Sequence, residues 1–249
     1  MSVFHIYRRG FTLIELLVVV ALMSLLMALG MPAFYRMARG NKVEECARNI
    51  KLGLEQAQLR AASERRYVAV VFPNGADADV SSSLRRYRLG GFRLAYVKKE
   101  DGGTFTFKRW VDPGWRNAPS GAILAKVDNA GFTPTDGYVT DCTAATTDVL
   151  KGVTKTETVG DTTTTTTLFG TLASIKNDDG NAIDVGANSA IIFSPYGGTV
   201  IGSKLHLLIS EAEVNGSSIK YPSGGTTSGR TSNYLVLKIN NLTGRVEYE

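Results

Sequence analysis

Few side chains in this 249-residue sequence have the types and spacing that catalysis or metal binding would need. The only histidines are His5 and His206, so we expect neither a histidine-based triad nor a multi-histidine metal site. The sequence also has no P-loop and no dinucleotide-binding fingerprint. We therefore expect that the protein is not an enzyme and needs neither a cofactor nor a metal.

Two short motifs imitate functional sites. Residues 217–220, Ser-Ser-Ile-Lys, have the spacing of a nucleophilic serine and lysine, but they lack the companion motifs of penicillin-binding enzymes. Residues 177–181, Asn-Asp-Asp-Gly-Asn, with Asp184 behind them, group oxygen ligands around a glycine as a calcium loop does. They lack the 12-residue pattern that ends in glutamate. We interpret the first motif as a coincidence and the second as a solvated turn.

A basic stretch between residues 85 and 99 is more suggestive, because it contains no acid and includes aromatic rings. Cations beside aromatic rings are how proteins hold single-stranded nucleic acid. However, Phe92, Leu94 and Tyr96 alternate along one predicted strand, so they are expected to point into the core. That would leave the cations on a solvated rim or at a subunit contact, which we favour over nucleic-acid binding. The cations are Arg85, Arg86, Arg88, Arg93, Lys98 and Lys99.

A long apolar segment dominates the predicted organisation of the N-terminal region. The 21 residues 11–31 contain one charged side chain, Glu15, and as a helix they would be about 30 Å long, enough to cross a bilayer. A carboxylate there costs about 2.5–3.5 kcal/mol on insertion scales, so Glu15 should have a cationic partner. Cleavage between Gly10 and Phe11 would create one, the amine of Phe11, in this subunit or a neighbour. This argument already points to assembly.

The helix is expected to continue beyond Pro32, to about Ser63, with a total length of roughly 80 Å. Pro32 lacks a backbone donor, so a bend or a locally melted turn is expected there. Apolar residues beyond it follow the i, i+3, i+4, i+7 spacing of a helix with one buried face. These residues are Val43, Cys46, Ala47, Ile50, Leu54, Ala57 and Ala61.

Beyond Arg66 the pattern changes to short strands with close turns, which favours antiparallel sheets. Residues 104–110 and 204–210 alternate apolar and polar side chains, which predicts one buried face for each strand. Residues 240–244 are predicted to form the loop of a terminal hairpin. The expected strands are 67–72, 92–99, 104–110, 122–127, 190–194, 204–210, 234–239 and 245–248.

Two segments are expected to add little to the core. Residues 140–167 are rich in threonine, with six in a row at 162–167, and poor in large apolar side chains. Residues 216–232, rich in Gly, Ser and Thr, are predicted to form a mobile or surface-exposed loop. The rest of the chain has the length of a single head domain behind the helix.

The residues around Gly10 resemble the processing site of type IV prepilins. The sequence Gly-Phe-Thr-Leu-Ile-Glu at residues 10–15, the apolar run behind it and Pro32 all fall in the register of that family. The resemblance implies that prepilin peptidase cuts after Gly10 and methylates Phe11, that Glu15 guides docking into a filament, and that Pro32 loosens the helix. Cleavage would also discard His5, so that His206 would be the only histidine of the mature chain.

Two other interpretations of the apolar run remain open. A secretory signal peptide would be cut after Gly30, because Ala28 and Gly30 are small, but the run is longer than the roughly 7–15 residues of a signal core. A plain membrane anchor would not be cut. Arginines and a lysine flank both ends of the run, so the positive-inside rule does not orient it. The processing motif favours the prepilin interpretation.

The later part of the chain resembles, more loosely, minor pseudopilin H of type II secretion and its relatives in type IV pili and competence systems. The resemblance rests on residues 193–197 (Phe-Ser-Pro-Tyr-Gly), on the Gly-Arg-Val at residues 244–246, and on Ala57, Arg60 and Ala61 in the helix. In this comparison the threonine-rich segment, about 140–167, is an insertion. DNA-binding relatives share a C-terminal Gly-Arg-x-Arg, where this chain has Gly-Arg-Val-Glu.

Cys46 and Cys142 are the only cysteines, and the bacterial envelope beyond the inner membrane is oxidising. A disulfide between them is one possibility. The other is that Cys46 packs as a small apolar residue on the helix and Cys142 is a loop thiol.

These observations predict an α+β protein, in which a long N-terminal helix with a membrane-spanning first half packs on a C-terminal antiparallel, β-rich pilin head. The expected divisions are a leader at 1–10, a transmembrane or filament-core helix at 11–31, its amphipathic continuation at 32–63 and the head at 64–249. Loss of the leader removes two arginines, which lowers the net charge from +5 to +3.

The expected role is that of a structural minor pilin or pseudopilin. It would cross the bacterial inner membrane once with its head in the periplasm and then join a type II secretion pseudopilus or a type IV pilus. Expected partners are other pilin or pseudopilin subunits, prepilin peptidase, the inner-membrane assembly machinery and membrane lipid. A DNA-binding minor pilin for DNA uptake is the alternative.

Overall fold

The structure is a computed structural model. It describes residues 12–74, 80–101, 104–135, 137–139, 142, 154–159, 162–167, 172–186, 189–216, 218–222 and 231–249. The predicted cleavage site between Gly10 and Phe11 lies outside these residues. The chain divides into two units, Met1–Arg39 and Gly40–Glu249, and each is described by itself.

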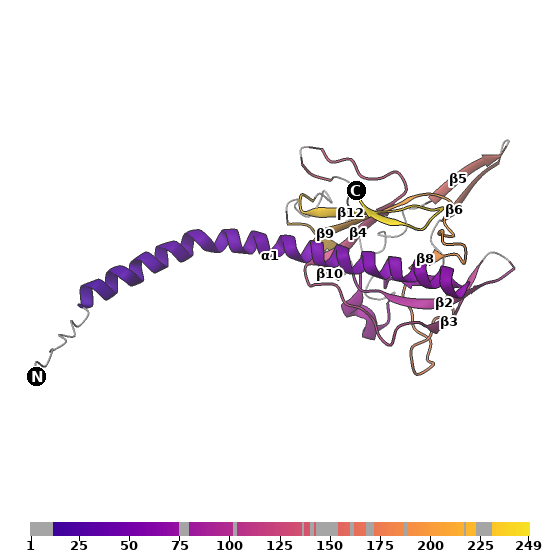
Figure 1. The fold of residues 1–249 in the computed structure, drawn as a ribbon, viewed down its shortest axis with the longest axis horizontal. Coiled ribbons are helices and arrows are strands. Elements are labelled where there is room, and N and C mark those ends of the chain that lie inside the picture. Colours follow the sequence, from indigo (N-terminus) through magenta and orange to yellow (C-terminus); the bar gives the residue numbers. More distant parts are fainter. Residues whose placement is uncertain are drawn as a thin grey trace, which may run out of the picture. The chain divides into compact units, whose positions relative to one another are not determined.

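Helix α1 comprises Leu13–Glu64 (Figure 1), and its helical assignment runs through Pro32 without interruption. The predicted melted turn is therefore wrong, while the predicted bend stays a prediction. Within the described part of the chain, no helix combines the length and the hydrophobicity that crossing a membrane requires. The membrane span predicted at residues 11–31 thus also stays a prediction.

The part of α1 in the second unit is amphipathic, as predicted. All seven residues of the expected apolar stripe, from Val43 to Ala61, have at most 1% of their surface exposed. The opposite face carries i,i+4 ion pairs, with Arg48 2.9 Å from Glu44 and Lys51 3.2 Å from Glu55. Such exposed pairs stabilise a helix only by a few tenths of a kcal/mol, so packing of the apolar stripe holds this part of the helix in place.

Five strands form one sheet in the order β7-β3-β2-β1-β8. All neighbours are antiparallel except β3 and β7, which are parallel. Successive residues of β1 point to opposite faces of this sheet, so Val68 and Val70 belong to one core and Ala69 and Val71 to the other. The strands are β1 Tyr67–Val71, β2 Arg93–Lys99, β3 Phe105–Trp110, β7 Leu172–Ala173 and β8 Ala190–Phe193.

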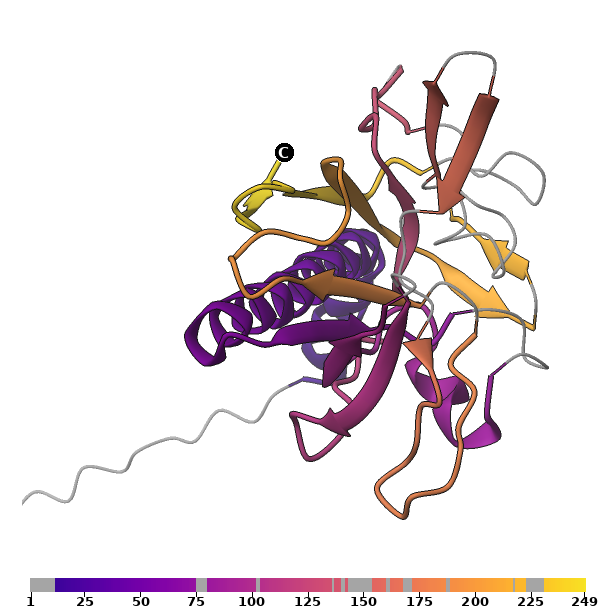
Figure 2. The same cartoon turned by 90° about the vertical axis from the view of Figure 1, so that its right-hand side faces the viewer.

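Four strands form a second, antiparallel sheet in the order β13-β12-β9-β4. Figure 1 and Figure 2 show the C-terminal part of α1 lying alongside both sheets. The strands are β4 Ala122–Asp128, β9 Leu205–Glu211, β12 Tyr234–Ile239 and β13 Val246–Tyr248. All eight predicted strands are confirmed to within two residues at each end, and the hairpin loop 240–244 joins β12 to β13.

Six shorter elements of the described chain were not predicted, and the two-residue strand β7 is one of them. A 3-10 helix, Ser82–Tyr87, precedes β2. Strands β10 (Glu213–Asn215) and β11 (Ser218–Lys220) pair with each other, and so do β5 (Thr154–Val159) and β6 (Thr162–Thr167) in the threonine-rich segment. Threonine is β-branched and enters strands readily even where few large apolar residues are present.

The main core lies between the helix and the inner faces of both sheets, and a second core covers the outer face of the five-stranded sheet. The helix approaches β2 closely at Gly53, where a Cβ atom would overlap the ring of Phe92. Because glycine has no side chain, the ring packs directly on the helix backbone. The contact is to the residue immediately before β2.

Two predictions about burial are wrong. Strand β9 is buried on both faces, because His206, Leu208 and Ser210 are as inaccessible as the alternating apolar residues. It lies between β4 and β12, and its polar side chains have partners that the alternation does not reveal. The expected loop 216–232 also contributes Ile219 and Tyr221 to the main core, while residues 223–230 lie outside the described residues.

Candidate functional site

Glu15 lies in the first turn of α1, where it caps its own helix. The Thr12 backbone N–H and hydroxyl donate hydrogen bonds of 2.9 and 2.8 Å to Glu15 Oε2, and the Glu15 N–H donates one of 3.3 Å to Thr12 Oγ1. This is a capping box, in which Ser or Thr and a Glu three residues later satisfy each other's backbone groups. The Thr-x-x-Glu spacing of residues 12–15 is the signal in the sequence that could have predicted this cap.

The apolar side chains behind Glu15 have no cover within the described chain. The large ones from Leu13 to Met31 are 43–81% exposed. A large contiguous apolar surface is typical of a region that contacts another protein or a membrane. The predicted docking partner of Glu15, the amine of Phe11, lies outside the described residues, so that pairing stays a prediction.

The two C-terminal motifs singled out in the sequence lie against each other and against the helix. Gln58 Nε2 donates a 2.6 Å hydrogen bond to the carbonyl of Thr243, and the Thr199 N–H donates one of 2.9 Å to the carbonyl of Asn241. Gly244 has a φ of +70°, and a Cβ atom there would collide with the carbonyl oxygen of Gly197. Both motifs are therefore explained by packing of the hairpin loop on the turn after β8.

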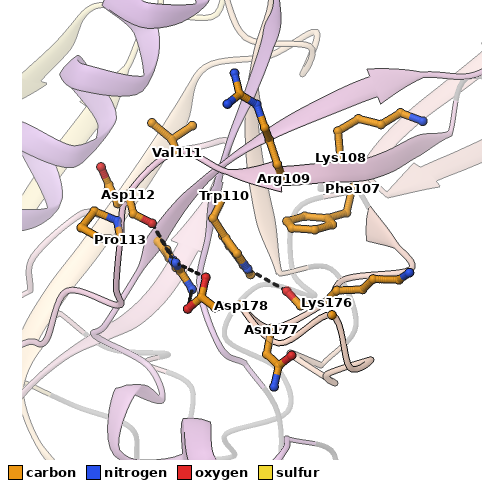
Figure 3. A pocket seen from close by; sticks show the side chains of 12 residues that line it. Phe107, Lys108, Arg109, Trp110, Val111, Asp112, Pro113, Lys176, Asn177 and Asp178 are labelled. Carbon is orange, nitrogen blue, oxygen red and sulfur yellow. Dashed lines mark hydrogen bonds and ion pairs between the residues drawn. The ribbon is translucent and has the colours of Figure 1, made fainter.

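An open cavity of about 550 Å³ lies beside β3 (Figure 3), and Arg93 is one of the residues that line it. Arg93 is 2% exposed, and its guanidinium lies 4.5 Å from the ring centroid of Trp110. It donates to both carboxylate oxygens of Asp178, at 3.1 and 2.7 Å, and to the carbonyl of Asp112, at 3.1 and 2.8 Å. Trp110 Nε1 donates a 2.7 Å hydrogen bond to the carbonyl of Lys176.

This arrangement joins the calcium-like segment to the basic stretch, which lies far from it in the sequence. The calcium-like segment 177–181 forms a turn, and its Asp178 is the counter-ion of a buried arginine from the basic stretch. A buried guanidinium needs such partners, since an unpaired buried charge is costly. Within the described residues, no group of three or more His, Cys, Asp and Glu side chains could hold a metal ion.

The basic stretch is divided between the interior and the surface. Phe92, Leu94 and Tyr96 are buried, as predicted. The expectation that all the cations lie on a rim is wrong for Arg88 and Arg93, which are 8% and 2% exposed. Arg88 donates a hydrogen bond to the carbonyl of Gly216, and burial lowers its pKa. The four remaining cations are exposed: Arg85, Arg86, Lys98 and Lys99.

Both cysteines are free and buried, so the structure contains two separate thiols rather than the disulfide that the sequence allowed. Cys46 lies on the buried helix stripe, and burial, with a smaller contribution from Glu45, raises its pKa to about 12. The Cys142 thiol lies 3.5 Å from the carbonyl oxygen of Val139. A thiol with so high a pKa has almost no thiolate at neutral pH, which makes Cys46 unreactive.

His206 is a strand residue, as interpreted from the sequence, and it lies on β9 with its Nδ1 atom 2.6 Å from Glu249 Oε2. Glu249 also lies 3.9 Å from the Lys238 ammonium. The side-chain carboxylate of Glu249 therefore has two partners, His206 and Lys238. In the Ser-x-x-Lys motif, Ser217 lies outside the described residues and Lys220 is exposed.

Comparison with known families and structures gives two findings. The prokaryotic N-terminal methylation motif matches residues 7–31. The chain is also similar to the crystal structure of the type IV minor pilin FimU of Pseudomonas aeruginosa strain PAO1, with 11% identity, a TM-score of 0.36, and coverage of 84% of this chain and 89% of that one. So weak a structural likeness carries no argument about function. No curated protein matches the chain. The matched methylation motif thus covers the N-terminal part of a long helix, α1, that is followed by antiparallel sheets.

Proposed function

We propose that the chain is the precursor of a minor pilin or pseudopilin. Prepilin peptidase cleaves it between Gly10 and Phe11, and the new N-terminus is methylated. The N-terminal part of α1 anchors the subunit in the bacterial inner membrane with the head in the periplasm. The subunit then joins other pilin-like subunits in a type IV pilus or a type II secretion pseudopilus. The methylation motif at residues 7–31 carries this proposal.

The exposed apolar surface of α1 supports assembly. Exposing apolar area to water costs about 25 cal/mol for each Å², so the side chains from Leu13 to Met31 need lipid or neighbouring helices around them. Glu15 fits the same role. Both bonds from Thr12 end on Oε2, and among the described residues nothing bonds Oε1. That oxygen is available to accept a hydrogen bond from the amine of a neighbouring subunit.

The processing step is tested by co-expressing the full chain with prepilin peptidase and sequencing the N-terminus by mass spectrometry. We expect a mature chain that begins at N-methylated Phe11. Gly10→Ala should leave the precursor uncut, because the peptidase recognises the residue before the cleaved bond. Ala28→Leu is the matched control, since it would block a signal peptidase cut after Gly30 but leave the cut at Gly10 intact. A wild-type N-terminus at Met31 would contradict the proposal.

The alternative, a DNA-binding minor pilin, is less well supported. Two of the six cations in the basic stretch are buried, and Gly244 and Arg245 are followed by Val246 and Glu247 rather than by a second arginine. With few phosphate contacts available, counterion-release binding fades steeply as salt rises.

We expect little binding of single- or double-stranded oligonucleotides in fluorescence anisotropy at roughly 150 mM salt. Micromolar binding that survives this salt and is lost in an Arg85→Glu, Arg86→Glu variant would make DNA capture the leading function.

A further inference from the structure

A second cleft in the head is lined by cations from two parts of the fold. Arg65 and Arg66 follow the last residue of α1, while the other four belong to β2 and β3. None of the residues that line the cleft is acidic. We call this the basic cleft, and its cations are Arg65, Arg66, Lys98, Lys99, Lys108 and Arg109.

A β-bulge brings two of these cations to the same side of β3. Tyr96 pairs with Arg109 and Val97 with Phe107, so Lys108 is an extra residue opposite the junction of Tyr96 and Val97. Bulges let neighbouring side chains share one face of a strand, where regular pleating would send them to opposite faces. Figure 3 shows Lys108 and Arg109 extending away from Phe107 and Trp110. The bulge therefore concentrates positive charge instead of dispersing it.

Part of this charge is not neutralised within the described chain. Lys98 pairs with Glu100 at 3.1 Å, Glu100 also interacts electrostatically with Lys108, and Arg109 lies 4.6 Å from the ring centroid of Tyr96. For Arg65, Arg66 and Lys99, the described residues provide no ion pair. Crowded like charges repel one another, so such a group is stabilised by an external anion.

The end of the helix explains only part of the cluster. Cations near a helix C-terminus interact favourably with its dipole, by about 0.3–1 kcal/mol, which accounts for Arg65 and Arg66. The helix dipole does not account for Lys108 and Arg109, which belong to β3 and lie at the cleft because of the bulge. Convergence of the two elements on one cleft points to a ligand.

The aromatic rings in the cleft are already engaged. The Tyr96 ring carries the Arg109 guanidinium, and its hydroxyl donates a 2.8 Å hydrogen bond to Glu64 Oε1. Tyr67 packs against Phe105 with the ring centroids 5.5 Å apart. Stacking of nucleobases, which single-strand binders use, therefore has no evident platform here, and charge is the recognisable feature.

We propose that the basic cleft binds a multivalent phosphate anion, with phosphate groups close enough together to be contacted at once. Guanidinium groups match phosphate oxygens in a two-pronged geometry, and lysine ammonium groups add point charges around them. Three guanidinium and three ammonium groups suit a chain of linked phosphates better than a single phosphate or carboxylate. The inference is independent of the processing and assembly proposed above.

The test uses the full chain in a non-ionic detergent and isothermal titration at roughly 150 mM salt. We expect inorganic tripolyphosphate to bind at least about tenfold more tightly than orthophosphate, and ATP to bind about as tightly as tripolyphosphate. Lys108→Gln with Arg109→Gln should weaken tripolyphosphate binding at least about tenfold. Arg85→Gln with Arg86→Gln is the matched control, because it removes two exposed cations outside the cleft, and it should change the affinity less than about twofold.

Thermal melting of each variant checks that it is folded, and both pairs are exposed side chains whose removal leaves the core intact. Absence of tripolyphosphate binding, or equal losses in the two double variants, would overturn the proposal. So would ATP binding that is at least about tenfold tighter than tripolyphosphate binding, since the base would then be recognised. If oligoglutamate bound as tightly as tripolyphosphate, the proposed ligand would be an acidic protein segment instead of a phosphate chain. If a thymidine oligonucleotide bound more tightly than tripolyphosphate, the proposed ligand would be a nucleic-acid strand.

Discussion

The two parts of α1 are both rich in apolar residues, but they differ in how those residues are arranged. From Leu13 to Met31 apolar side chains surround the helix and are 43–81% exposed, whereas from Val43 to Ala61 they form one stripe that is at most 1% exposed. A stripe needs a partner on one side, and the sheets of the same chain provide it. A helix that is apolar all round needs partners on every side, which the described chain does not contain. The difference separates folding of the head from assembly of the subunit.

The largest expected effect on stability comes from shortening a side chain in the buried stripe. Ile50→Ala should lower the free energy of unfolding by about 2–5 kcal/mol, because it removes packed methylene groups and leaves a cavity. Leu22→Ala, in the exposed first part, should change head stability by less than about 0.5 kcal/mol. Denaturant unfolding of the full chain in detergent, followed by near-UV circular dichroism of the head, measures both. Equal losses would mean that the first part also packs on the head.

Removing the charge from the first part tests assembly instead of folding. Glu15→Ala should leave membrane insertion intact or ease it, and should reduce incorporation into filaments at least about tenfold, because a pair in an apolar layer is worth more than 1.4 kcal/mol. Quantitative immunoblotting of sheared filaments gives the incorporated fraction. Glu55→Ala is the matched control, since Glu55 pairs with Lys51 on the surface of the second part. Normal incorporation of Glu15→Ala would rule out the pairing with the amine.

Alkaline pH should lower the free energy of unfolding through ionisation of the Cys46 thiol in the buried stripe. Its folded pKa of about 12 exceeds the unfolded value of about 8.5, so the folded state holds the thiol proton more tightly. The associated stability is complete below about pH 8.5 and is lost as the pH rises towards 12. The free-energy difference between the wild type and Cys46→Ala should therefore shrink by roughly 2 kcal/mol from pH 7.5 to pH 10.5.

Urea unfolding of both proteins at the two pH values measures this change. Burial also raises the pKa of Tyr221, so the variant retains an alkaline loss of its own. A constant difference between the two proteins would show that the thiol ionises normally in the folded state.

The smallest effect is expected for a polar contact within the head. Asp178→Asn removes the counter-ion of Arg93 but leaves the carbonyl of Asp112 in place. Because the Asp178 side chain is 64% exposed and solvent screens the pair, the loss should be only about 1 kcal/mol. Asp179→Asn, next to it in the same exposed turn, should be neutral. A loss as large as that of Ile50→Ala would place this contact among the main supports of the fold.

Much of the fold was predictable from the sequence because it rests on periodic patterns. The helix stripe and the eight main strands follow from spacing of 3.6 and 2 residues, which a reader can find without coordinates. The errors arise where tertiary partners override the pattern. His206 alternates as if it faced solvent but has Glu249 beside it, and Ile219 lies in a segment whose composition indicates a loop.

The candidate site was predictable only where a local motif defines it. Gly10, Phe11 and Glu15 follow from a contiguous motif, and the family model matches the same region. The partnership of Arg93 with Asp178 joins residues 85 positions apart, and the basic cleft depends on a bulge in β3. Neither long-range pairing nor strand register can be derived from one sequence, so these features required the structure.

The close approach at Gly53 determines how the head responds to a mechanical load. The ring of Phe92 rests on the helix backbone there, where a Cβ atom would overlap it. Sliding the helix along its axis by one turn, about 5.4 Å, would bring Asn49 or Ala57 to that place, and both carry a side chain. We therefore expect tension along this part of α1 to press a side chain against Phe92, the residue just before β2, rather than to let the helix slip.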